Sequence, residues 1–250
     1  MTFDVAQYQE SPGYDGDPGA LALIEEDDGR AHRRASRKAD PVYEWFAEFR
    51  HELAKQHDGR IVYCRGVLDR GDPWLTSTGL PVGHLHHHTA AAVTASRDRR
   101  HKGNKPGANS GIVAFCINQH GGKGLPNTHG FCNQVNDRDG SIFIVGAHAQ
   151  WHAGLGDFTG TRWARLGIRK DMGNRALWGT ENVSKGLSED FTAAQLEANA
   201  ATDVALRITL GWRTFPVRLM NHKDWTTRKI DTRYPALMWA DLAVDAWQDR

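Results

Sequence analysis

Apolar side chains recur at helical spacing in two segments of the chain. Asp40 and Pro41 resemble an N-cap and a first helical residue, and the segment after them predicts a helix that ends near Gly59. A capping box over residues 192–195 opens a second predicted helix, which extends to Gly211. The predicted buried positions are Val42, Trp45, Phe46, Phe49 and Leu53 in the first helix, and Leu196, Ala200, Val204 and Ile208 in the second.

Shorter β-prone runs lie between these helices. Residues 60–65 and 178–183 each predict a strand, while residues 131–136 and 141–145 flank a glycine turn and predict a hairpin. The apolar run 112–117 is too short to assign to helix or strand by periodicity. Strands interleaved with helices, without a regular repeat, predict a mixed α/β domain with one central sheet flanked by helices.

The charge pattern separates the start of the chain from the rest. Residues 1–28 contain eight acids and no base, and residues 30–38 contain five bases and no acid. Such a stretch, rich in Gly, Pro and Asp, buries little apolar surface, so we expect a flexible arm over residues 1–39 and one domain over residues 40–250. The arm is either a solvated tail or an arm that contacts the domain or a charged polymer.

Composition indicates an ordinary soluble protein, with 40% hydrophobic and 24% charged residues in a chain of 250. No apolar stretch is long enough to cross a membrane, and residues 1–20 lack the pattern of a secretory signal peptide, so we expect cytosolic synthesis. Cys64, Cys116 and Cys132 form no CxxC pair and are expected to be reduced and partly buried. A net charge of +1 gives no basic domain for nucleic acid.

A histidine-rich segment over residues 84–88 is the first candidate for chemistry. Strand alternation places His86 and His88 on one face and Leu85 and His87 on the other, so only one subset can meet a metal ion. The residues alone leave that choice open. A solvated polar strand end is the alternative.

A second candidate lies near the end of the chain, in residues 221–231. His222 and Asp231 are ligand types that catalytic zinc accepts, and Lys229 could stabilise a developing oxyanion. Two protein ligands are too few for such a site, so a third would come from the histidine-rich segment. The alternative is a polar surface loop with a chance ion pair.

Two further segments are ambiguous alone. Glu181, in a predicted strand, is either exposed or a proton acceptor with a raised pKa. Trp151 and His152 either line a groove or complete a loop.

Together and in this order, these segments resemble the type 2 N-acetylmuramoyl-L-alanine amidase family, zinc amidases that include phage endolysins and peptidoglycan-recognition proteins. The resemblance covers about residues 60–240. The matching motifs are His87-His88-Thr89-Ala90, Cys132-Asn133 with Arg138-Asp139-Gly140, Trp151-His152-Ala153-Gly154, Gly173-Asn174 with Gly179-Thr180-Glu181, and His222 and Trp225 with Arg228-Lys229 and Asp231.

The resemblance implies a zinc-dependent hydrolase that cleaves the amide bond between N-acetylmuramic acid and L-alanine of the stem peptide. It implies that His87, His222 and Asp231 bind Zn²⁺, that Glu181 is the acid/base and that Lys229 stabilises the oxyanion. The residues implied to contact glycan or peptide are Trp151, His152 and Asn133.

The chain departs from the family pattern at two places. No second acid follows Glu181 in the family's E-x-E-N-x-G pattern. Thr226-Thr227 stands where a three-residue Ala-Pro-Gly is usual, so the spacing from His222 to Lys229 is one residue shorter. Neither departure removes a zinc ligand. A one-residue shift in the alignment of His86, His87 and His88 would change which histidine is assigned as the first ligand.

The motif set favours a monomeric phage endolysin, without membrane insertion, that accumulates in the host cytoplasm and reaches the peptidoglycan after membrane permeabilisation. A cytosolic amidase that recycles muropeptides would carry the same site. A wall-binding module of the same fold without catalysis is the alternative from another class. A His/Asn metal nuclease fits less well, because its ligands normally lie within one compact unit.

Overall fold

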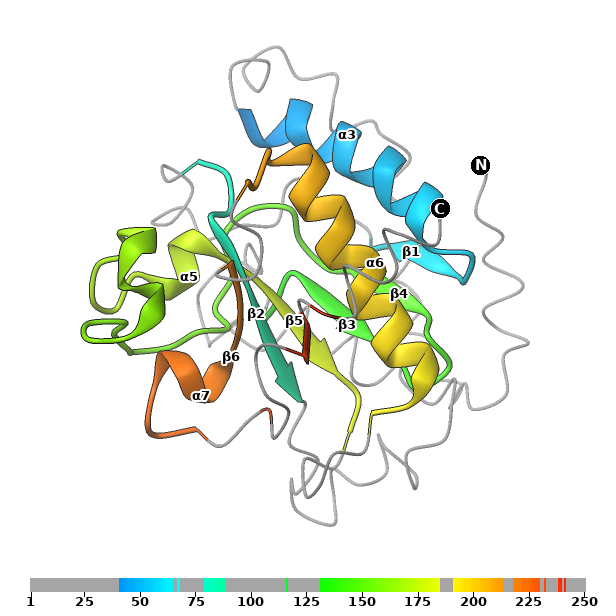
Figure 1. Ribbon diagram of the computed structural model, residues 1–250. Coiled ribbons are helices and arrows are strands. Elements are labelled where there is room, and N and C mark those ends of the chain that lie inside the picture. Colours follow the sequence, from blue (N-terminus) through cyan, green and yellow to red (C-terminus); the bar gives the residue numbers. More distant parts are fainter. Residues whose placement is uncertain are drawn as a thin grey trace, which may run out of the picture.

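The structure is a computed structural model that describes residues 41–64, 67, 79–88, 116, 131–184, 191–213, 218–229, 232, 238–239 and 241. Over these residues the strands form one six-stranded mixed sheet in the order β1-β4-β3-β5-β2-β6. Helices α3 and α6 lie side by side next to the sheet (Figure 1). This arrangement confirms the predicted mixed α/β class with a central sheet.

Both predicted helices are present. Helix α3 spans Pro41–Gln56, and its buried residues are the five apolar positions that the sequence pattern predicts. Helix α6 spans Ala193–Thr209 and begins with the predicted capping box, in which Thr192 and Gln195 exchange hydrogen bonds. Local signals therefore located both helices well, because caps and apolar spacing act within a few residues.

The predicted apolar face of α6 is only partly correct. Ala200 and Val204 are buried, but Leu196 is half-buried and Ile208 is exposed. The face that meets the sheet instead carries polar residues, and three of them, Asn199, Thr202 and Asp203, are completely buried. Hydrogen bonds to polar strand residues compensate for this burial.

The predicted strands are confirmed with small shifts of their ends. Strand β1 spans Ile61–Tyr63, and the hairpin consists of β3 (Gln134–Asn136) and β4 (Ile142–Ile144), which pair antiparallel. Gly140 in its turn has a φ of 85°, a conformation that glycine adopts readily. Strand β5 spans Leu177–Asn182.

The centre of the sheet is parallel. Strand β2 (Gly83–His88) lies between β5 and the short strand β6 (Leu219–Asn221), and all its residues are buried. The carboxyl ends of β2, β5 and β6 therefore meet at one edge of the sheet, the position where open α/β sheets place their ligand sites.

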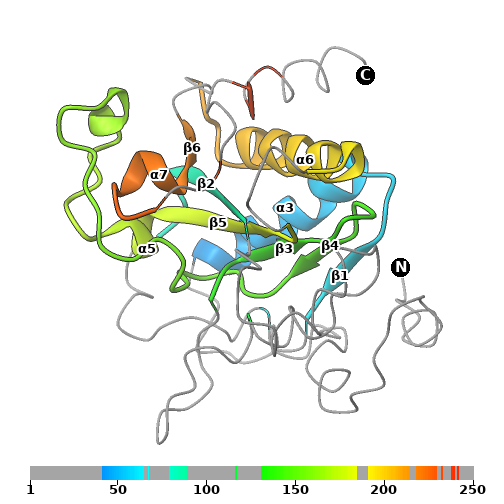
Figure 2. The same ribbon diagram turned by 90° about the horizontal axis from the view of Figure 1, so that it is seen from below.

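The two faces of the sheet have different cores. One face packs against α3 and α6, where Trp178 of β5 contacts the aromatic rings of Trp45 and Phe49. In Figure 2, α6 runs along one side of the strands. The other face carries a smaller apolar cluster that includes Leu85, Trp163 and Trp225. Three short helical elements contact this second cluster: η5 (Arg162–Leu166), α5 (Gly173–Ala176) and α7 (His222–Trp225).

Several predictions fall outside the described residues: the arm over residues 1–39, most of the run 112–117, and Asp231. The three cysteines are free, as predicted, and are fully rather than partly buried.

Among the described residues, no helix has the length and apolar character needed to cross a membrane.

Candidate metal centre

Three histidines from distant parts of the chain meet at the carboxyl edge of the parallel strands. The Nδ1 atom of His87, on β2, lies 2.9 Å from Nδ1 of His222, and its Nε2 atom lies 3.2 Å from Nδ1 of His152. All three side chains are buried. The structure thus brings together His87 and His222, the two predicted zinc ligands that fall among the described residues.

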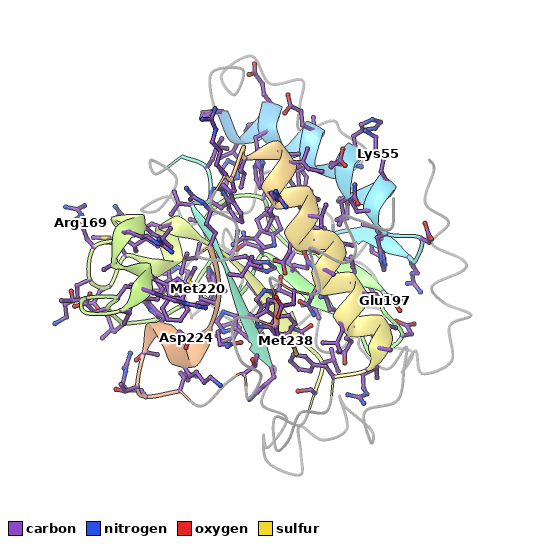
Figure 3. The ribbon with its side chains drawn as sticks, in the orientation of Figure 1. Lys55, Arg169, Glu197, Met220, Asp224 and Met238 are labelled. Carbon is purple, nitrogen blue, oxygen red and sulfur yellow. The ribbon has the colours of Figure 1, made fainter. Side chains whose placement is uncertain are left out.

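Strand β6 and helix α7 position His222. Strand β6 pairs in parallel with β2, and the chain turns from Asn221 directly into α7, of which His222 is the first residue. A capping box between Asn221 and Asp224 closes this turn, with the Asn221 backbone N–H donating to the Asp224 carboxylate at 2.8 Å. Figure 3 shows Asp224 on α7 beside Met220 of β6.

A tightly bound loop holds His152. The Asn174 side-chain oxygen accepts hydrogen bonds from the backbone N–H groups of Ala153 and Gly154, at 2.6 and 3.2 Å. The ring of His152 lies directly on Gly179, where a Cβ atom would be 2.3 Å from the ring. Only glycine permits this close approach. Burial lowers the pKa of His152 to about 3, so the ring is neutral near pH 7.

The hydrogen bonds of these rings determine which nitrogens carry protons. Nε2 of His152 donates to the Leu177 carbonyl at 2.9 Å, so its Nδ1 accepts from Nε2 of His87. Nε2 of His222 donates to the Ala153 carbonyl at 3.1 Å. In the neutral rings, Nδ1 of His87 and Nδ1 of His222 therefore each present a lone pair toward the other.

Two facing lone pairs are the arrangement that a cation between the rings would satisfy. Histidine ligands of metals normally donate their other ring N–H to a carbonyl or similar acceptor, as His222 does here. Two nitrogens bound to one tetrahedral zinc ion lie about 3.3 Å apart. The observed distance of 2.9 Å is slightly shorter, so a small increase in the separation of the two Nδ1 atoms would accommodate such an ion.

Glu181 lies next to His87. The two residues are register partners on the parallel strands β5 and β2, so both side chains project from the same face of the sheet. Glu181 is 5% exposed, which excludes the alternative of a solvent-facing glutamate. Burial of the thiol raises the pKa of Cys132, and the neighbouring Cys116 and the charge of Glu181 act in the same direction.

The other predicted residues have different environments. Trp151 is 39% exposed, next to the buried His152. Lys229 is exposed in the turn after α7, and its role stays a prediction. Asn133 is buried, and its amide hydrogen-bonds to Gly146, His148 and Gly179. These bonds tie the loop after β4 to β5, and a contact between Asn133 and substrate stays a prediction.

A second group on the opposite face of β2 could also hold a metal ion. It consists of His84, His86 and Asp203, all completely buried, with one ligand atom from each within 4.8 Å of the others. Sequence reasoning missed Asp203, because its partners lie on a distant strand. The available signal was a carboxylate next to the predicted apolar position Val204 of the helix, together with the second face of the histidine-rich strand.

A scan against known protein families and a search of curated proteins each found no match.

Proposed function

We propose that this protein is a zinc-dependent peptidoglycan hydrolase that cleaves the amide bond between N-acetylmuramic acid and L-alanine of the stem peptide. The observation that carries the proposal is the 2.9 Å approach of Nδ1 of His87 to Nδ1 of His222, with Glu181 on the adjacent strand. These are the residues that the amidase motifs assign to the metal and to proton transfer.

The metal would be held by His87, His222 and Asp231. Two imidazoles and one carboxylate leave a position open for water, as catalytic zinc sites require. When bound, zinc supplies Lewis-acid chemistry, lowering the pKa of a coordinated water toward ~7 and polarising the scissile carbonyl. The Leu177 and Ala153 carbonyls keep the rings in the required tautomers, through His152 and His222.

Glu181 would move the proton during hydrolysis. Its carboxylate accepts a proton from the attacking water as the water oxygen bonds to the amide carbon. The same proton passes to the nitrogen as the carbon–nitrogen bond breaks, which releases a stem peptide with a free L-alanine amino group. General acid–base catalysis of this kind contributes about 10²–10⁴-fold in rate. Lys229 would stabilise the oxyanion.

The exposed indole of Trp151 would contact the glycan or the peptide, beside the buried His152. The motif set further supports a phage endolysin that acts on the wall of its host after membrane permeabilisation. A monomer in the host cytoplasm before lysis is part of the same proposal.

Mass spectrometry of purified peptidoglycan after digestion tests the reaction. We expect free stem peptides with an L-alanine amino terminus from the zinc-loaded protein, and none after treatment with a chelator. New reducing sugar ends instead would exclude an amidase. Binding of zinc and peptidoglycan without any released product would identify a wall-binding module.

A further inference from the structure

A fully buried ionisable cluster joins β2 to α6, on the face of the sheet opposite His87. Nδ1 of His84 lies 2.5 Å from Oδ1 of Asp203, and Nε2 of His86 lies 3.4 Å from Oδ2 of the same carboxylate. All three side chains are completely buried. Two imidazoles thus approach different oxygens of a single carboxylate in a site without solvent.

The remaining ring nitrogens of both histidines have hydrogen-bonding partners. Nε2 of His84 lies 2.7 Å from the Thr180 hydroxyl, and Nδ1 of His86 lies 3.1 Å from Oδ1 of Asn199. The Asn199 amide nitrogen donates to Asn182 and to the Gln195 carbonyl, which determines that its oxygen faces His86. Nδ1 of His86 must therefore carry a proton, and a ring with that single proton presents its Nε2 lone pair to Asp203.

The gap between His86 and Asp203 is suited to a cation. Within the described part of the chain, neither Nε2 of His86 nor Oδ2 of Asp203 makes a hydrogen bond. Two facing acceptors in a dry site are costly unless a positive charge lies between them. Their 3.4 Å separation exceeds the 2.7–2.9 Å of a charge-assisted hydrogen bond, but it is close to the ~3.3 Å between two ligands of tetrahedral zinc.

We propose that His84, His86 and Asp203 bind a second divalent transition-metal ion of the zinc class, separate from the His87–His222 centre. A site of two imidazoles and one carboxylate binds such ions in preference to calcium or magnesium. Thr180 and Asn199 supply the outer hydrogen bonds that orient histidine ligands. Binding requires the contact between His84 and Asp203 to lengthen from 2.5 Å to about 3.3 Å.

The surroundings of this second site indicate a structural role. The ring of Trp239 stacks on His86 with centroids 4.1 Å apart, and His84 and Asp203 have no exposed surface. A buried site without solvent access cannot admit a substrate, whereas a catalytic zinc ion needs an open position that water or substrate can reach. An ion here would link α6 to β2, the strand that carries His87 on its other face. The inference depends only on this cluster and does not require amidase activity.

Metal content of the full chain, purified after zinc loading, tests the proposal by elemental mass spectrometry. We expect two equivalents in the wild-type protein, one in Asp203→Asn, one in His222→Ala and none in the double variant. The Asn side chain keeps the shape of Asp203 but removes its charge and replaces one acceptor oxygen with an NH2 donor. Thr202→Val, on the same helix as Asp203, is the matched control. It removes the buried hydrogen bond from Gln134 of β3 without touching the three ligands, so it should retain both equivalents.

X-ray absorption of zinc-loaded His222→Ala provides a measurement that does not depend on the folding of Asp203→Asn. The remaining ion should show two imidazole nitrogens and carboxylate oxygen as its ligands. The second site is overturned if His222→Ala contains no zinc, or if a folded Asp203→Asn retains both equivalents. A wild-type protein whose single equivalent is lost in Asp203→Asn but kept in His222→Ala would instead contradict the His87–His222 centre.

Discussion

Nδ1 of His87 lies 2.9 Å from Nδ1 of His222, and a hydrogen bond through the other nitrogen orients each ring. The two residues are 135 positions apart in the chain. They meet because β2 and β6 are parallel neighbours whose carboxyl ends lie at the same edge of the sheet. The same edge carries Glu181, the register partner of His87 on β5.

Replacement of Glu181 by Gln should abolish most activity without loss of metal. The amide has the same shape as the carboxylate but cannot accept the water proton, so we expect product release to fall by about 10²–10⁴-fold. Released stem peptide, measured by mass spectrometry alongside zinc content, provides the check. Full activity in a zinc-loaded Glu181→Gln protein would show that another group transfers the proton.

His152 should act through His87 as a positioning residue. Its Nδ1 accepts the hydrogen bond from Nε2 of His87, so His152→Ala should weaken zinc binding by about 10–100-fold. His152→Asn is the matched control, because its side-chain oxygen can replace the Nδ1 acceptor and should restore much of the affinity. Competition with a chromogenic chelator measures both constants. Equal affinities in wild-type and His152→Ala proteins would exclude this role.

Gly179→Ala should damage the same centre by a steric route. The new Cβ would lie 2.3 Å from the ring of His152 and displace it, at a cost of about 1–3 kcal/mol in the free energy of unfolding. Chemical denaturation measures that cost. The double variant Gly179→Ala, His152→Ala removes the ring and should be less destabilised than the sum of the two single variants. Additive effects would refute the proposed clash.

Trp151 and Leu155 are both large apolar side chains exposed near the site, which makes them a matched pair. Trp151→Ala should weaken binding of muropeptide by about threefold to tenfold, because an aromatic face is lost, while leaving zinc content unchanged. Leu155→Ala should have little effect. Isothermal titration with a soluble muropeptide distinguishes the two variants, and the opposite ranking would move the substrate contact away from Trp151.

Local sequence signals predicted the helices and the hairpin because caps, turns and apolar spacing act over a few residues. Strand alternation correctly placed His87 and His86 on opposite faces of the strand. Choosing which of them faces the predicted zinc site required the residues that pack against each face. His222 and Asp203 supply those partners from distant elements.

The buried polar face of α6 could not be predicted by the same reasoning. Helix patterns identify a core by its apolar stripe, whereas Asn199, Thr202 and Asp203 are buried against the polar residues of the neighbouring strands. Strand β6 was also missed, because it has only 3 residues and forms by pairing with β2. Both features depend on tertiary contacts.

The most direct test of the central claim is an anomalous difference map, collected at the zinc edge from crystals of the zinc-loaded protein. We expect a peak between Nδ1 of His87 and Nδ1 of His222, about 2.0–2.1 Å from each nitrogen, with the Asp231 carboxylate as the third protein ligand. An anomalous difference map of the zinc-loaded crystals that shows both rings but no peak between them would contradict the account.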